Sequence, residues 1–220
     1  MSLSDTYVTL SREIAASGAR LVAVTKTHPV ERIRELYDLG HRDFGENRVS
    51  ELVEKQAALP QDINWHFIGH LQSKKAKTVA PIAHLIHSGD SLKLLRELDK
   101  RAAGNSVDVL LQYHIAREES KYGLTPESGR DLLNDVAREP LRNVRILGVM
   151  GMATYTDDQD QVAEEFRTLH EIFSDLKDRY FEDDPKFSEI SMGMSGDYRL
   201  ALDQGSTLIR IGSLLLGERQ

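Results

Sequence analysis

The sequence predicts an α/β fold, a (β/α)8 TIM barrel preceded by one extra helix, with residues 1–220 forming a single domain. Short apolar segments alternate eight times with segments of helical period, which is typical of a parallel sheet. Five of the seven intervals between expected strand starts are about 20–23 residues, near the minimum for a strand, a crossover helix and turns. No glycine-rich phosphate fingerprint follows the first strand, which disfavours the competing open doubly wound sheet.

The expected strands are apolar and partly β-branched, which suits burial on both faces of a parallel sheet. The first strand begins at Leu21 with the run Leu-Val-Ala-Val-Thr-Lys, and the strongest strand begins at Val107. The expected strands cover residues 21–26, 43–47, 65–69, 84–88, 107–115, 145–153, 187–194 and 207–211. They start near residues 21, 43, 64, 84, 107, 145, 187 and 207.

The segments between these strands have the periodicity and the end signals of helices. One begins at Pro29, carries an apolar stripe that includes Ile33 and Leu36, and ends at Gly40. Thr125 is expected to cap another. The expected crossover helices cover residues 29–40, 49–58, 72–80, 91–103, 126–138, 159–180 and 198–204, with an incomplete last helix at 214–219 and the extra helix at 4–17.

Composition excludes several classes of function. The chain has 28 Lys and Arg against 35 Asp and Glu, a net charge of -7, so it lacks the positive field typical of nucleic-acid binding. The absence of cysteine removes disulfides, thiolate metal sites and cysteine nucleophiles. Neither a secretory signal nor an apolar run of roughly 20 residues is present, so we expect a cytoplasmic protein that binds neither nucleic acid nor membranes.

A barrel carries its chemistry at the carboxyl ends of its strands. Lys26 ends the first expected strand, where partial desolvation would favour the uncharged amine that forms a Schiff base. An ordinary lysine that reaches solvent is the alternative reading. After the last two strands, Ser195-Gly196 and Gly212-Ser213 place a hydroxyl beside a glycine at a helix start, which favours an anion such as phosphate. Tight turns without a ligand would use the same residues.

Arg210 lies within the apolar strand Leu-Ile-Arg-Ile, where a buried arginine needs a partner. That partner is either an acidic residue inside the barrel or a heteroatom of a cofactor. A lysine, a phosphate-binding turn and an inward arginine at one end of a barrel are together the parts of a pyridoxal phosphate site.

Several separate blocks, in order along nearly the whole chain, resemble the pyridoxal phosphate homeostasis proteins. These blocks are LVAVTKTHP (21–29), FGENRV (44–49), WHFIGHLQSKK (65–75), SKYGL (120–124), GVMGMA (148–153), MGMSGDY (192–198) and RIGSLLLGER (210–219). The resemblance implies a monomeric barrel, related to the cofactor domain of alanine racemases, that binds pyridoxal 5'-phosphate.

The resemblance also implies the role of each site residue. Lys26 matches the lysine that forms the Schiff base, Asn47 matches an asparagine beside the cofactor, and Arg210 matches the arginine that faces the pyridine nitrogen. Gly193 and Met194 would line the rim of the same site. The implied cofactor-binding residues are therefore Lys26, Asn47, Met194, Ser195, Arg210, Gly212 and Ser213.

Three positions depart from the usual pattern of that family. Lys74 stands where the family usually has asparagine, and Tyr198 stands where it usually has methionine. Ser213 replaces a frequent threonine but keeps the hydroxyl group.

We expect storage and delivery of the cofactor, with PLP-dependent apoenzymes as recipients, rather than catalysis. An arginine stays protonated, and opposite the pyridine nitrogen it makes the ring a poor electron sink. Racemisation needs a base on each face of the substrate, and the short segment after the last strand is expected to leave no room for a domain that supplies the second base. The alternatives are an amino-acid racemase or decarboxylase, and an aldolase that uses Lys26 without a cofactor.

Other polar residues have simpler interpretations, and no metal site is expected. His66 and His70 have the spacing of a zinc pair but lack the intervening glutamate, so His66 is expected to be packed or hydrogen-bonded. His84 and His87 have no identifiable third ligand. The lysines at positions 74, 75 and 77 are expected to form a solvated helix face.

Overall fold

The structure is a computed structural model that describes residues 2–102, 104–118 and 122–217. Within these residues, eight parallel strands pair in sequence order and close into a barrel, with β8 returning to β1. The strands are β1 (Arg20–Val24), β2 (Asp43–Glu46), β3 (Asn64–Phe67), β4 (Leu85–Gly89), β5 (Val107–Gln112), β6 (Val144–Met150), β7 (Glu189–Ser191) and β8 (Leu208–Ile211). The predicted (β/α)8 fold is confirmed.

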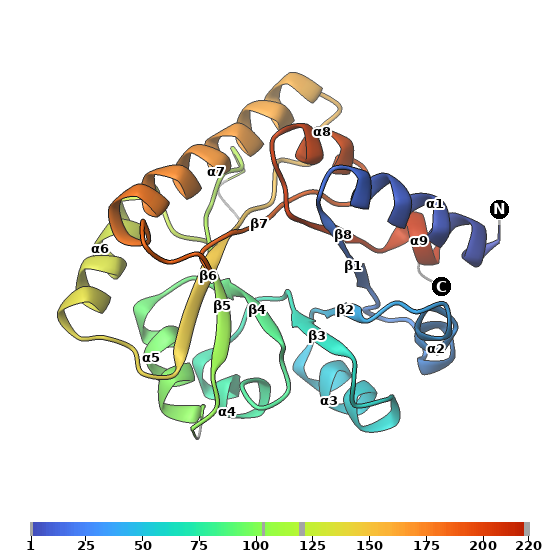
Figure 1. Cartoon of the computed structure of the whole chain (residues 1–220), viewed down its shortest axis with the longest axis horizontal. Coiled ribbons are helices and arrows are strands. Elements are labelled where there is room, and N and C mark those ends of the chain that lie inside the picture. The colour runs from blue at the N-terminus through green and yellow to red at the C-terminus, as the bar shows by residue number, and fades with distance from the viewer. Residues whose placement is uncertain (1, 103, 119–121, 218–220) are drawn as a thin grey trace.

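Helices surround the strands on the outside of the barrel (Figure 1). They are α1 (Leu3–Ala16), α2 (Val30–Asp38), α3 (Val49–Ala58), α4 (Ala76–Val79), α5 (Leu92–Arg101), α6 (Pro126–Arg138), α7 (Gln159–Tyr180), α8 (Tyr198–Asp203) and α9 (Ser213–Leu216). The extra helix α1 begins with a capping box between Ser2 and Asp5 and packs beside β1 and α9, where the ring closes. None of the helices in the described part of the chain combines the length and apolar character needed to cross a membrane.

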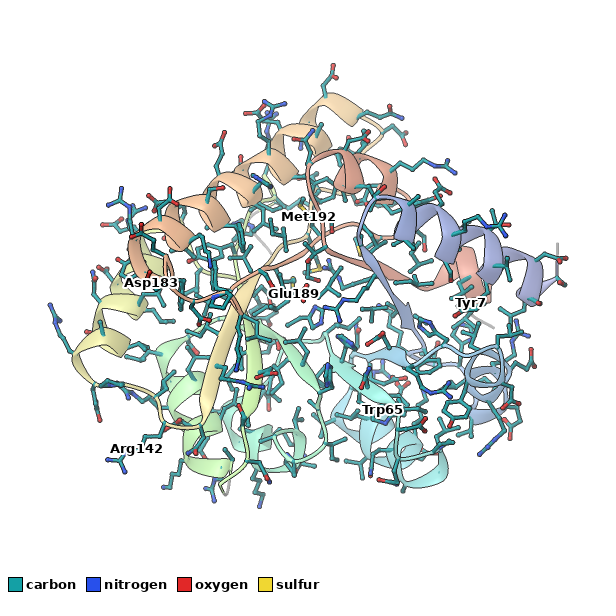
Figure 2. All side chains as sticks on the ribbon, viewed as in Figure 1. Tyr7, Trp65, Arg142, Asp183, Glu189 and Met192 are labelled. Atoms are coloured by element: carbon teal, nitrogen blue, oxygen red, sulfur yellow. The ribbon has the colours of Figure 1, made fainter. Side chains whose placement is uncertain are left out.

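Strand alternation divides the apolar residues into two layers. The larger core lies between the strands and the helices and includes Phe44, Trp65 and Ile209. The smaller core fills the barrel interior with Val22, Leu85, Leu110, Met150 and Leu208. Side chains occupy the space inside the ring of strands, so the ring is packed and is not a pore (Figure 2).

Several elements are shorter than the sequence predicts because the chain turns early at the carboxyl ends of the strands. The seventh strand ends at Ser191, and Gly193 then adopts φ +90°, which turns the chain toward α8. The helix expected at 72–80 divides into a 3-10 turn (Ser73–Lys75) and the short α4. The last helix ends at Leu216, and the remainder of the predicted helix at 218–219 lies outside the described residues, as does residue 103.

The close approach of β6 to β7 requires a glycine at position 148. A Cβ atom there would lie 1.8 Å from the backbone oxygen of Glu189 on the neighbouring strand. The oxygen belongs to the paired backbone of β7, so it cannot move aside without disturbing the strand pairing.

We therefore expect Gly148→Ala to lower the free energy of unfolding by about 3 kcal/mol or more, at or beyond the upper end of typical overpacking. The control is Gly18→Ala, since Gly18 also has a positive φ but has open space around its Cβ position; about 1–2 kcal/mol is expected there. Urea unfolding measures both. Equal losses in the two variants would contradict the interpretation.

Candidate functional site

The residues expected to form the site come together at one rim of the barrel. They follow the ends of four consecutive strands of the ring, β7, β8, β1 and β2. Because all strands are parallel, their carboxyl ends meet at the same end of the barrel. The residues at this rim are Lys26, Asn47, Met194, Ser195, Gly212 and Ser213, and Arg210 lies one residue before the end of β8.

Lys26 sits in a tight and strained turn. It lies two residues beyond Val24, the last residue of β1, at the carboxyl end of the barrel. The next residue, Thr27, has φ +67°, a left-handed conformation that is rare for a β-branched side chain. Its N–H donates to Glu51 Oε2 at 2.6 Å, and the carbonyl of Thr25 accepts a hydrogen bond from Lys55 Nζ at 2.8 Å. The backbone on both sides of Lys26 is thus anchored to α3.

This anchor, which we call the outer clamp, consists of Glu46, Glu51 and Lys55. Lys55 Nζ lies 2.7 Å from Glu46 Oε1 and 3.2 Å from Glu51 Oε2, and Lys55 and Glu46 are both buried. Burial raises the pKa of Glu46, against the opposing effect of the hydrogen bonds from Lys55 and Thr25. The sequence alone does not reveal the clamp. The (i, i+4) spacing of Glu51 and Lys55 was the available signal, but it is equally typical of exposed helix pairs.

Asn47 offers an acceptor to a ligand. Its side-chain oxygen is buried and has no hydrogen-bond partner among the described residues. A buried amide oxygen without a partner costs free energy, so such atoms occur where a ligand or water supplies the missing bond. The neighbouring backbone is tightly packed, since a Cβ atom at Gly69 would lie 2.1 Å from the backbone oxygen of Asn47.

The turns after β7 and β8 are joined by a hydrogen bond. Ser195 Oγ accepts from the N–H of Leu214, in the first turn of α9, at 3.2 Å. The N–H of Met194 donates to Asp197 Oδ1 at 2.6 Å, which shapes the β7 turn, and the Met194 side chain is 38% exposed at the rim. A cavity of 630 Å³ adjoins these turns and is lined in part by Ser195, Gly196 and Leu214.

Arg210 is buried and points into the barrel. Its Nη1 donates to Ser191 Oγ at 2.6 Å, and its Nη2 donates to the backbone oxygen of Gly151 at 3.0 Å. Among the described contacts of the guanidinium these acceptors are neutral, so the ion pair that the sequence left open is not what holds it. Burial lowers the pKa of Arg210 to about 10, and the side chain therefore stays cationic at pH 7.

Behind Arg210 lies a row of polar side chains that no sequence pattern connects. Ser191 Oγ is 2.9 Å from His87 Nδ1, and His87 Nε2 is 2.9 Å from His66 Nδ1. His66 Nε2 in turn lies 3.1 Å from Asp43 Oδ1. The prediction that His66 is packed or hydrogen-bonded is confirmed. Across residues 2–102, 104–118 and 122–217, no group of three or more His, Asp or Glu side chains is arranged to hold a metal ion.

His70 belongs to the mouth of the barrel rather than to its interior. Its Nδ1 lies 3.0 Å from Asp90 Oδ2, and its ring stacks on Tyr122 with centroids 4.2 Å apart. These residues follow β3, β4 and β5, so they lie at the same end of the barrel as the expected site. The spacing of His66 and His70 therefore does not place them in one metal site.

Comparison with known proteins assigns the chain to a family. Residues 3–220 match the family model described as the N-terminal domain of alanine racemase. The pyridoxal phosphate homeostasis protein of Aquifex aeolicus is 40% identical over 205 residues, covering 92% of this chain and 88% of the relative. The chain belongs to the pyridoxal phosphate homeostasis protein family.

Solved structures of similar proteins agree with this assignment. PipY of Synechococcus elongatus PCC7942, solved without pyridoxal phosphate, has 35% sequence identity and a TM-score of 0.89, covering 98% of this chain and all of that one. The same protein with pyridoxal phosphate bound has 34% identity and a TM-score of 0.86, and the match covers the same fractions of the two chains. Alanine racemase from Bartonella henselae, at 17% identity and a TM-score of 0.73, shares the fold; the match covers 99% of this chain and 58% of the racemase.

The structure shows the environment of two positions that depart from the pattern of the homeostasis protein family. Tyr198 is buried, and its hydroxyl donates to Glu13 Oε2 of α1 at 3.0 Å, which links α8 to the extra helix. Lys74 is exposed on the 3-10 turn together with Lys75, and Lys77 is exposed on α4. The prediction of a solvated lysine face is confirmed.

The outer clamp leads to a stability prediction. Replacing Lys55 with methionine leaves the Glu46 carboxylate buried without its cation, so Lys55→Met should lower the free energy of unfolding by about 3–5 kcal/mol at pH 7. Adding Glu46→Leu should recover most of that loss, because neither of the two buried charges of the clamp then remains. Urea unfolding measures both variants.

The matched control is Lys77→Met, which removes an exposed lysine and should change stability by no more than about 0.5 kcal/mol. The clamp would be unimportant to stability if Lys55→Met behaved like this control.

Proposed function

We propose that this protein binds pyridoxal 5'-phosphate reversibly at the barrel mouth and stores or delivers it inside the cell, with little or no catalytic turnover. The observation that carries the proposal is the convergence of an amine, a buried arginine and a buried unpaired amide oxygen at one rim, on Lys26, Arg210 and Asn47. The structure of PipY with pyridoxal phosphate bound, at 34% identity over nearly the whole chain, supports the same ligand.

The residues present fit this cofactor. When bound, pyridoxal phosphate supplies an aldehyde that condenses with an amine and releases water. The ε-amine of Lys26 would hold it covalently, while Ser195, Gly212 and Ser213 would bind its phosphate at the joined turns. Gly196 leaves open space at its Cβ position, which gives a ligand access to the backbone there.

The charge of Arg210 supports a carrier rather than an enzyme. A guanidinium that is cationic at pH 7 can donate a hydrogen bond to the ring nitrogen but cannot accept one from a protonated ring nitrogen, so it disfavours protonation of the ring. The ring then withdraws electrons weakly, and the chemistry that depends on carbanion stabilisation is slow. We propose further that the protein works as a monomer and that apoenzymes in need of the cofactor are its recipients.

An amino-acid racemase or decarboxylase is the second candidate, and His70 is the observation that favours it. Its pairing with Asp90 places an imidazole at the mouth that holds Lys26. The cofactor-free aldolase is the remaining alternative, and the absence of a visible Schiff-base absorption band in the purified protein would favour it.

Peptide mapping tests the proposed site. After incubation with pyridoxal phosphate and reduction with borohydride, we expect a pyridoxyl adduct on Lys26 and none on that peptide in Lys26→Ala. Lys75→Ala, which removes an exposed lysine, is the control and should retain the adduct. An adduct confined to other lysines, or no adduct at saturating cofactor, would overturn the site assignment.

Chiral analysis separates the carrier from the racemase. We expect L-alanine and L-serine, incubated at length with the loaded protein, to racemise no faster than with free pyridoxal phosphate at the same concentration. Turnover well above that background, lost in His70→Ala, would establish the enzyme instead.

A further inference from the structure

The barrel interior contains polar side chains that the binding of a cofactor at the rim does not use directly. Asp43 on β2, His66 on β3, His87 on β4 and Ser191 on β7 form a continuous row that ends at Arg210 on β8; we call the first four the interior chain. His66, His87 and Ser191 are fully buried. The row runs from the amino end of β2 to the carboxyl end of β7, through the middle of the barrel.

Burying such a row of polar side chains costs free energy, so its presence needs a reason other than packing. Barrel interiors are normally filled by branched apolar side chains, and here Val22, Leu85 and Leu208 fill part of the same space. Apolar residues at the positions of His66, His87 and Ser191 would avoid the desolvation of polar groups altogether. Packing alone does not account for the interior chain.

The charge at Asp43 sets the direction of the first hydrogen bond. Burial acts to raise the pKa of Asp43, but the interactions with His66 and a hydrogen bond from Asn64 outweigh it and keep the pKa below its usual value. Asp43 is therefore a carboxylate, which only accepts hydrogen bonds, and His66 Nε2 must carry the proton that faces it.

The direction of each of the other hydrogen bonds along the interior chain then follows. Burial lowers the pKa of His66 and lowers that of His87 well below its usual value, so both rings are neutral and carry one N–H each. With His66 protonated on Nε2, its Nδ1 accepts from His87 Nε2–H, and His87 Nδ1 accepts from the hydroxyl of Ser191. The Ser191 hydroxyl thus donates its proton to His87, and its Oγ accepts the hydrogen bond from Arg210 Nη1.

We propose that Asp43, His66, His87 and Ser191 are positioning residues that fix the orientation of Arg210 toward the bound cofactor. Ser191 Oγ and the carbonyl of Gly151 together hold two nitrogens of the planar guanidinium, which sets its plane and leaves its other edge for the ligand. The interior chain keeps Ser191 Oγ an acceptor toward Arg210. The carboxylate of Asp43, at the other end, determines which atom donates in each hydrogen bond between them. This inference rests on the proposed binding of pyridoxal phosphate at the mouth.

The direction of the interior chain is testable without any ligand. In protein labelled with ¹⁵N-histidine, NMR distinguishes Nε2–H from Nδ1–H tautomers. We expect neutral Nε2–H tautomers for His66 and His87 near pH 7, assigned by their loss in His66→Gln and His87→Gln. An Nδ1–H tautomer or an imidazolium at either position would overturn the proposed direction.

The effect on the cofactor is tested with Ser191→Ala. This variant removes the acceptor of Arg210 Nη1, a hydrogen bond to a charged group, so pyridoxal phosphate should bind about tenfold more weakly. The visible absorption of the bound cofactor should also shift, since the arginine no longer holds its place at the ring. Ser191→Thr keeps the hydroxyl and should restore both the affinity and the spectrum.

Asp43→Asn tests the far end of the chain, since it removes the charge but keeps an acceptor oxygen. We expect weaker binding than in the unmodified protein, by a smaller factor than in Ser191→Ala, with a spectral shift in the same direction. Asp62→Asn is the matched control: Asp62 is exposed, bonds to Arg42 and Tyr37 outside the barrel, and should leave affinity and spectrum unchanged.

The outcomes separate this inference from the proposed function. If Ser191→Ala and Asp43→Asn both bind with unchanged affinity and spectrum, the positioning role is wrong although the carrier function stands. If Ser191→Ala does not fold, Asp43→Asn compared with Asp62→Asn decides the question. If the unmodified protein binds no pyridoxal phosphate, the proposed function fails, and the tautomers still report on the direction of the chain.

Discussion

Closure of the sheet by the pairing of β8 with β1 is the constraint on which the site depends. In this pairing Arg210 lies beside Val22, so the arginine of the last strand and the lysine turn of the first become neighbours. The same pairing puts the turn of Gly212 next to the turn of Lys26 around the ring, with the turn of Ser195 one strand further on. An open sheet would leave the first and last strands at opposite edges, and the amine and the guanidinium could not serve one ligand.

Polar groups are buried on both sides of the barrel wall, and each set contacts one part of the proposed site. Outside the wall, the outer clamp holds the backbone around Lys26 and opposes the strain at Thr27. Inside the wall, the interior chain meets Arg210 through Ser191. Strand alternation separates the two sets, since Glu46 faces α3 and Asp43 faces the interior although both belong to β2.

The two sets differ in how they meet the cost of burial. The clamp places opposite charges in direct contact, with Lys55 bonded to Glu46 and Glu51. In the row that runs from Asp43 through the interior chain to Arg210, neutral side chains separate the carboxylate from the guanidinium. The two charges are therefore linked through hydrogen bonds and are not in direct contact. A direct pair would neutralise Arg210, whereas this row leaves its charge available to a ligand at the mouth. This difference is consistent with a structural role for the clamp and a positioning role for the chain.

The sequence alone determined the barrel, its extra helix and the residues at the rim. Eight apolar runs with crossover spacing specify a parallel barrel, and strand ends are local features, so Lys26, Ser195 and Gly212 could be located one strand at a time. Only the tertiary structure decided which polar residues meet. Asp43, His66, His87 and Ser191 lie on separate strands up to 104 residues apart between directly bonded neighbours, and their contact depends on register and on which face each side chain takes. A single-residue shift in register would turn a buried polar side chain from the interior to the helix layer, and no local pattern reports that choice.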